Sequence, residues 1–215
     1  MAVKKVLKEN IGLLTFLLSM AIFRSAFADY YSIPSSSMEP TLEVGDRVGV
    51  SKMAYDLRVP FTMTKIARLN EPMRGDIIVF ESDAADKRLI KRVIGLPGDT
   101  VAMKNERLIL NGKPVEYQNV EFGETLITAT EMLPGKPHIV KFDQGMGASL
   151  GGFDPVTVPA DSYLVLGDNR RASADSRVYG FVPRGEIIGR ADKVLFSLDY
   201  DNYYMPKNNR LNESL

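Results

Sequence analysis

The chain has 215 residues, and its 27 lysine and arginine side chains equal its 27 aspartate and glutamate side chains in number. This length suits one or two small domains, and a hydrophobic content of 45% is ordinary for a globular protein. Zero net charge gives the protein no overall electrostatic attraction for nucleic acid. The absence of cysteine excludes disulfides, zinc sites with thiolate ligands and a cysteine nucleophile.

The N-terminal segment joins lysines within residues 1–10 to an apolar run over residues 11–28, in which Arg24 is the one charged residue. A helix over 11–28 would be roughly 27 Å long, close to the hydrocarbon thickness of about 30 Å. We expect a single transmembrane anchor over 11–28, with residues 1–10 in the cytoplasm because basic residues favour that side. These residues alone fit a cleavable signal peptide equally well, since residues 26–28 resemble a cleavage site.

Beyond residue 30, short β-type runs recur between turn signals, and long amphipathic helical patterns are absent. The clearest runs cover residues 76–80, 89–96, 107–110, 162–166 and 194–196. Asn111 and Gly112 predict a hairpin turn, because both residues tolerate positive φ. We expect a mostly β fold, with a main β domain formed by residues 29–103 and 161–215 and a β-rich inserted lobe over 104–160.

Four blocks outside the apolar segment contain the residues that suggest chemistry. They cover residues 33–42, 74–80, 89–99 and 167–177, the last running into 180–183. The first block holds three consecutive serines between two prolines, and a plain polar linker would explain that pattern as well. None of the blocks is specific when taken alone.

Lys91 is informative because of its place in an apolar run. In a strand, Leu89, Lys91 and Val93 share one side, so a half-buried face would desolvate the amine. Desolvation lowers the pKa of a lysine, which is what a neutral amine base requires. If the strand lies at a sheet edge, Lys91 is solvated instead, and these residues alone leave that alternative open.

Taken together, the four blocks resemble the type I signal peptidases (leader peptidases) of bacteria, which are membrane-tethered serine proteases. The resemblance runs from the apolar segment to about residue 191 and is weakest over 104–160. It implies a β-barrel or β-sheet catalytic domain on the extracytoplasmic (periplasmic) side of the inner (cytoplasmic) membrane, and it favours an anchor over a signal peptide. It also implies cleavage of preproteins after small residues at positions −1 and −3, with signal peptides and the lipid bilayer as partners and no metal or cofactor.

The resemblance also assigns roles by position in the blocks. Ser37 matches the nucleophile and Lys91 the general base of a Ser/Lys dyad that works through an acyl-enzyme. Ser35 matches a hydroxyl of the oxyanion hole, beside the Ser37 N–H, and Ser173 matches the residue that orients the lysine. The substrate-pocket positions are Tyr31, Ile33, Pro34, Leu89 and Ile90, and the positions of a structural ionic network are Asp168, Arg170, Asp175 and Arg177.

Three positions depart from the family pattern. Ser36 stands where many relatives have glycine, and Arg171 and Ala172 stand where the family usually has aspartate and asparagine. The last two put the local loop contacts in doubt, but not the dyad.

Two other functions share some of these features. Self-cleaving stress-response repressors use the same Ser/Lys chemistry, but no basic helix-turn-helix pattern is present here. A catalytically inactive anchored β-domain that binds exported proteins is the alternative function, against which the intact Ser37, Lys91 and Ser173 argue.

Two further expectations concern single features. We expect His138, the one histidine, to be an ordinary surface residue. A single histidine also argues against a His-based triad and against a metal site with several histidine ligands. We hypothesise that the apolar stretch 59–63 dips into the bilayer interface, although ordinary core packing explains it as well.

Overall fold

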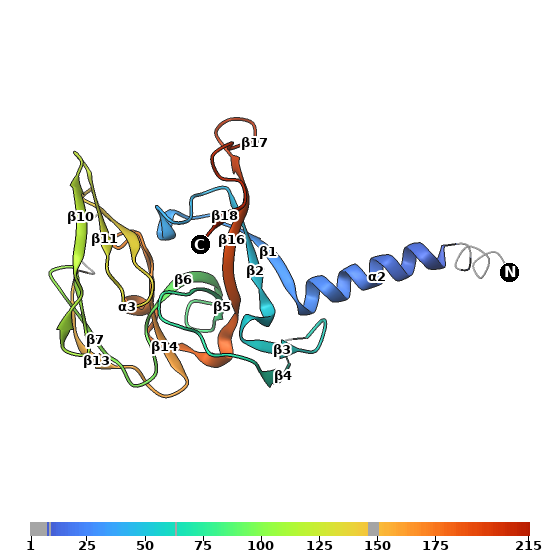
Figure 1. The fold of residues 1–215 in the computed structure, drawn as a ribbon, viewed down its shortest axis with the longest axis horizontal. Coiled ribbons are helices and arrows are strands. Elements are labelled where there is room, and N and C mark those ends of the chain that lie inside the picture. Colours follow the sequence, from blue (N-terminus) through green and yellow to red (C-terminus); the bar gives the residue numbers. More distant parts are fainter. Residues whose placement is uncertain (1–7, 9, 63, 146–150) are drawn as a thin grey trace.

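The computed structural model describes residues 8, 10–62, 64–145 and 151–215, and strands dominate this part of the chain (Figure 1). The expectation of a mostly β fold is therefore confirmed. The helical segments described are α2 (Ile11–Ala26), α3 (Ser176–Tyr179) and three single turns of 3₁₀ helix, η1 (Ser36–Met38), η2 (Lys52–Ala54) and η3 (Arg184–Glu186).

The largest sheet is antiparallel and, in the described part of the chain, has nine strands. Its pairing order is β1 (Ala28–Ser32), β2 (Asp46–Ser51), β16 (Ile187–Asp199), β5 (Ile77–Ser82), β6 (Lys87–Gly95), β14 (Ser162–Leu166) and β15 (Val182–Pro183), with β17 (Met205–Pro206) and β18 (Glu213–Ser214) paired to β16. The end strands β1 and β15 do not pair with each other among the described residues. Of the two expected forms, barrel or sheet, the open sheet is found.

Two smaller sheets, drawn on the left of Figure 1, are formed mainly by the segment expected to be the inserted lobe, and that name is kept for them. One has the order β13 (Phe153–Thr157), β7 (Thr100–Lys104), β8 (Arg107–Leu110) and β9 (Lys113–Pro114); the other has the order β10 (Tyr117–Phe122), β11 (Leu126–Glu131) and β12 (His138–Asp143). Asn111 and Gly112 form the turn between β8 and β9, both with positive φ, as predicted. Strand β7, which lies before or at the expected boundary of residue 104, pairs with β8 beyond it, and the division into a main domain and a lobe stays a prediction.

Both faces of the main sheet are covered where β5 and β6 pair. Ile77 and Val79 of β5 belong to one buried apolar cluster, whereas Ile78 and Phe80 belong to another on the opposite face. This double burial explains why residues 77–80 form a continuous apolar run rather than an alternating one. It also means that a polar side chain in the middle of β6 is removed from water.

The N-terminal helix α2 projects away from the sheet and passes directly into β1 (Figure 1). Ala28 pairs with Ser51, and the Lys52 N–H donates a 2.9 Å hydrogen bond to the Phe27 carbonyl. The expected helix over 11–28 is therefore wrong at its end, because residues 27 and 28 take backbone partners from β2 and the turn that follows it. Within the described ranges, no helix combines the length and the apolar character needed to cross a membrane.

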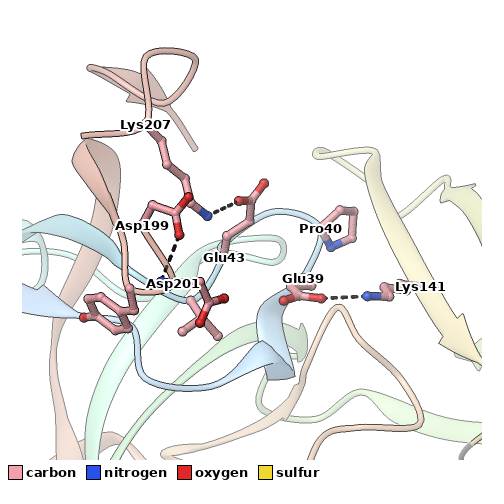
Figure 2. A pocket seen from close by; sticks show the side chains of 9 residues that line it. Glu39, Pro40, Glu43, Lys141, Asp199, Asp201 and Lys207 are labelled. Carbon is pink, nitrogen blue, oxygen red and sulfur yellow. Dashed lines mark hydrogen bonds and ion pairs between the residues drawn. The ribbon is translucent and has the colours of Figure 1, made fainter. Parts of the chain in front are cut away.

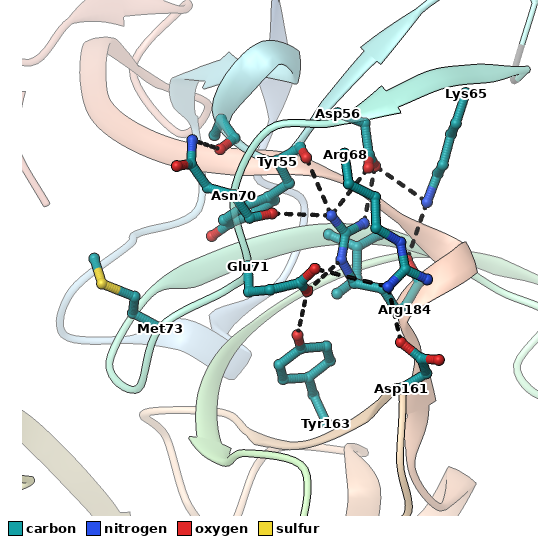
Figure 3. A network of polar contacts seen from close by, with 12 residues as sticks. Tyr55, Asp56, Lys65, Arg68, Asn70, Glu71, Met73, Asp161, Tyr163 and Arg184 are labelled. Atoms are coloured by element: carbon teal, nitrogen blue, oxygen red, sulfur yellow. Dashed lines mark hydrogen bonds and ion pairs between the residues drawn. The ribbon is translucent and has the colours of Figure 1, made fainter.

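A buried ionic network fastens a small hairpin to the main sheet (Figure 3). The hairpin consists of β3 (Asp56–Arg58) and β4 (Lys65–Arg68). The Arg184 guanidinium donates two hydrogen bonds of 2.9 Å to Asp56 and one of 2.8 Å to Glu71. Arg184 and Asp56 are almost completely buried, so each supplies the charge that the other needs inside the protein.

The turn of this hairpin carries the apolar stretch 59–63, of which residue 63 lies outside the described residues. Val59 and Phe61 are 37% and 64% exposed, so core packing is wrong as an explanation for Phe61. The Phe61 N–H donates a 2.5 Å hydrogen bond to Ser25 Oγ, which holds the turn against the end of α2. Contact of this turn with a bilayer stays a prediction.

Candidate active site

Ser37 and Lys91 meet in the structure although 54 positions separate them in the chain. Ser37 lies in η1, and Lys91 lies in the middle of β6. Lys91 Nζ is 2.7 Å from Ser37 Oγ, and the two residues are only 3% and 8% exposed. The geometry therefore joins a hydroxyl to an amine in a site from which most water is excluded.

The surroundings of Lys91 favour its neutral form. Leu89 and Val93 flank it on one face of the sheet and belong to the same apolar cluster, as strand alternation predicts. Burial is the largest effect and lowers the pKa of Lys91 to about 8, while the nearby carboxylates of Asp175 and Asp168 raise it in part. The alternative of a solvated lysine is wrong.

The turn that carries Ser37, called the nucleophile turn after the role expected for Ser37, covers residues 36–39 and contacts the loop over residues 167–170. Gly167 packs so closely that a Cβ on it would lie 2.3 Å from Ser173 Oγ and 2.4 Å from the Ser37 carbonyl oxygen. Asn169 donates hydrogen bonds of 3.2 Å from its N–H to the Ser37 carbonyl and from Nδ2 to the Ser36 carbonyl. Sequence reasoning assigned no role to Gly167 or Asn169, although both lie within the fourth block.

Ser35 and Ser173 both lie near Ser37. Ser35 Oγ is 3.4 Å from Ser37 Oγ, and Ser35 is exposed while Ser37 is buried. Ser173 is 3% exposed and lies close enough to the Asp175 carboxylate to help lower the pKa of that group. Its hydroxyl makes no well-directed hydrogen bond to the described residues, so the expected bond to Lys91 is not formed here.

The expected ionic network is present but divides into three separate pairs. Asp168 accepts two hydrogen bonds from Arg92, at 2.8 and 2.6 Å, and one of 2.5 Å from Thr41 Oγ1. Arg170 pairs with Glu131 of β11 at 2.6 Å, and Asp175 pairs with Arg177 at 2.7 Å. Sequence reasoning missed Arg92 and Glu131. Arg92 follows Lys91 directly in the third block. A buried role for its side chain could have been predicted, because alternation turns it to the opposite face of the same strand.

The comparisons with known proteins bear on this site. A family model described as signal peptidase, peptidase S26, matches residues 7–196. The chain belongs to this signal peptidase family. The signal peptidase I of Pseudomonas aeruginosa is 38% identical over 195 residues, which cover 82% of this chain and 67% of that protein. The signal peptidase I of Leptolyngbya laminosa is 40% identical over 191 residues, covering 85% and 75%.

A solved structure of a signal peptidase I from Enterococcus faecalis has 32% sequence identity and a TM-score of 0.37, and it covers 57% of this chain and 97% of that chain. Family membership confirms the expected enzyme class, a serine endopeptidase of the signal peptidase type.

One departure from the family pattern has a clear partner. Arg171 makes a two-pronged contact with Glu106, Nε to Oε1 at 2.6 Å and Nη2 to Oε2 at 2.8 Å, and Nη1 donates to the Asp143 carbonyl at 3.3 Å. The basic side chain therefore ties the loop after Arg170 to the turn between β7 and β8. Nothing in the structure explains Ala172.

The five expected substrate-pocket residues do not all lie together. Tyr31, Ile33 and Ile90 belong to one apolar cluster, whereas Leu89 packs into the cluster on the other face of the sheet. Pro34 is exposed next to Ser35. Tyr31 and Ile90 are partly exposed, whereas Ile33 is 2% exposed, so the three residues share one apolar cluster but Ile33 adds little to its surface.

His138 is not a surface residue, so that expectation is wrong. It is 8% exposed because alternation along β12 turns it inward and turns its neighbour Ile139 outward. Its Nε2 lies 3.4 Å from Glu131 Oε1 and 3.8 Å from Asp168 Oδ1. Burial is the largest effect on its pKa and lowers it to about 4, so the ring is neutral at ordinary pH.

Proposed function

We propose that this peptidase removes signal peptides from exported preproteins, with Ser37 as nucleophile and Lys91 as general base. The observation that carries the proposal is the 2.7 Å contact between Ser37 Oγ and Nζ of a buried lysine whose pKa is lowered to about 8. A serine hydroxyl is a weak nucleophile until a base accepts its proton, and a neutral lysine beside it can do so. The same contact argues against the inactive binding domain.

The proposed reaction has two halves. Ser37 Oγ attacks the scissile carbonyl while its proton passes to neutral Lys91, and the ammonium then protonates the leaving amine, which leaves an ester on Ser37. Lys91 next takes a proton from water, which attacks the ester, releases the acid and restores the serine. Ser35 Oγ and the Ser37 N–H are the proposed oxyanion donors, each worth on the order of 3 kcal/mol. Ser173 is the proposed residue that orients the lysine.

The proposed substrate lies as an extended strand along β6. On one side β6 pairs with β5 from Lys87 to Arg92, but on the other side β14 pairs only with Arg92, Val93 and Gly95. Backbone groups before Arg92 are therefore open on the edge that leads to Lys91, where an added strand can bind. Tyr31 and Ile90, the partly exposed members of one apolar cluster, support shallow pockets for small side chains at −1 and −3. Ile33, Pro34 and Leu89 are the further proposed lining residues.

We also propose that the chain is anchored to the inner (cytoplasmic) membrane by its N-terminal segment, with residues 1–10 in the cytoplasm and the β domain on the extracytoplasmic side. The support is the apolar surface of α2, where Leu13, Phe16 and Leu18 are all more than half exposed. Because α2 leads directly into β1, such an anchor would hold the dyad near the bilayer. The main sheet would then be the catalytic domain, and the inserted lobe would support it.

The proposed function can be tested by incubating the detergent-solubilised chain with a preprotein and sequencing the new N-terminus. We expect one cut, after a small residue at −1 that has a small residue at −3, and no cut by Ser37→Ala. A protein with Lys113→Ala, a change to an exposed lysine in β9, should cleave like the wild type. No cleavage of any preprotein by the wild type, or an equal rate for Ser37→Ala, would contradict the proposal.

A further inference from the structure

A cavity of about 340 Å³ opens beside the nucleophile turn and is lined by side chains of both charges (Figure 2). Figure 2 shows Lys141 reaching Glu39 from a strand of the inserted lobe, while Lys207 reaches Glu43 from the C-terminal part of the chain. The two ion pairs measure 2.6 Å and 2.9 Å. They resemble each other, but they attach to different points of the chain after Ser37.

Lys141 contacts the fourth block through its backbone. Its N–H donates a 2.9 Å hydrogen bond to the Asp168 carbonyl, and its carbonyl accepts a 2.8 Å hydrogen bond from the Arg170 N–H. Strand β12 is therefore hydrogen-bonded to the loop on both sides of Asn169. Asn169 in turn donates hydrogen bonds to the carbonyls of Ser36 and Ser37, so hydrogen bonds link Lys141 through the loop to the nucleophile turn.

The side chain of Lys141 holds the other end of the same turn. Its Nζ donates to Glu39 Oε2 at 2.6 Å, and the Glu39 N–H closes the turn by donating to the Ser36 carbonyl at 3.1 Å. The two side chains are only 17% and 24% exposed, so water screens this pair less than it screens a surface pair. One residue of the inserted lobe thus fixes the turn both before and after Ser37 Oγ.

We propose that Lys141 is a positioning residue for the nucleophile, which acts by holding Glu39 and the loop over 168–170 in one arrangement around Ser37. The inference rests on the proposed function. Attack on a carbonyl depends steeply on the position of the attacking atom, and a displacement of about 1 Å can cost a factor of about 100 in rate. The inserted lobe, where the family resemblance is weakest, therefore takes part in setting the geometry of the dyad.

The test compares four variants in preprotein cleavage. Lys141→Met keeps the backbone bonds but removes the ion pair, and Glu39→Gln removes the pair from the other side. We expect each to lower kcat about tenfold with little change in KM, and we expect the double variant to be no worse than either. Lys141→Arg should recover most of the rate, because a guanidinium can still reach the carboxylate. The midpoint of the pH profile should not move, since Lys91 is untouched.

Lys207→Met is the matched control, because it removes the neighbouring ion pair in the same cavity. It should cleave like the wild type, and melting temperatures of all variants should be recorded beside the rates. A kcat for Lys141→Met within twofold of the wild type would overturn the positioning role, as would an equal loss in Lys207→Met. A wild-type chain that cleaves no preprotein would overturn the proposed function and this role together.

Discussion

The buried environment of Lys91 determines how the proposed activity should depend on pH. Only the neutral amine can accept the Ser37 proton, and burial lowers the pKa of Lys91 to about 8. We predict that kcat/KM rises with pH through a midpoint near 8, because the fraction of neutral lysine rises there. A cleavage profile from pH 6 to 11 measures this. A rise confined to pH values near the ordinary lysine pKa of about 10.4 would contradict a desolvated base.

The close packing of Gly167 against the turn that carries Ser37 gives a second test at the scale of residues. A Cβ at this position would lie within 2.5 Å of Ser173 and of the Ser37 carbonyl oxygen, so the loop or the nucleophile turn must move. We predict that Gly167→Ala lowers kcat about 100-fold. Gly185→Ala is the matched control, since nothing lies within 4 Å of its added Cβ. Equal kinetics for the two variants would show that the turn tolerates the displacement.

At the scale of residues, the contact between Ser37 and Lys91 was expected from the family resemblance, whereas many of the contacts around it were not. None of the four blocks is specific alone, but their order and spacing carry the resemblance, and strand alternation already placed Lys91 beside Leu89 and Val93. The contacts of Glu131 and Lys141 join segments far apart in the chain, and no local period encodes such contacts. His138 was predicted wrongly because a proline before it obscured the alternation of β12.

At the scale of elements, the β3–β4 hairpin carries the clearest prediction. Phe61 is 64% exposed at its turn, next to the end of α2. We predict that Phe61→Asp weakens liposome binding of a protein that begins at residue 27, because the change places a charge in the apolar tip. Aspartate also tolerates the positive φ of 64° at this position, so the backbone need not change.

Phe122→Asp provides the control for that experiment, because Phe122 is 78% exposed on β10 in the inserted lobe. It should leave liposome binding unchanged. If the two variants partition alike while both remain folded, the hairpin tip is not the part that contacts lipid.

The ends of elements were harder to predict than their existence. The turn at Asn111 and Gly112 and the strands over 76–80 and 107–110 follow from local chemistry. The end of α2 does not, since residues 26–28 are compatible with a helix until β2 offers Ala28 a strand partner. Tertiary pairing decided this end.

At the scale of the whole molecule, buried ionisable groups join the inserted lobe to the main sheet. His138 of β12 faces Glu131 and Asp168, and its pKa is lowered from 6.5 to about 4. Between these values the unfolded chain binds a proton that the folded chain does not, so acid favours unfolding. We predict that this group removes about 3 kcal/mol of stability as pH falls from 6.5 to 4.

Urea unfolding at several pH values measures this loss, and His138→Gln should reduce the slope because it removes the titrating ring. An identical slope in the variant would assign the acid sensitivity to other groups. The chain holds one histidine, so its ring signal can be followed without overlap during the same titration.

The central claim is that Lys91 is the base that activates Ser37, and the initial rate of preprotein cleavage by Lys91→Met tests it most directly. Methionine fills the same buried space without a charge, so the variant should fold and melt no lower than the wild type. We predict a rate about 1000-fold or more below that of the wild type at pH 9. A folded Lys91→Met variant that cleaves within tenfold of the wild-type rate would contradict the dyad.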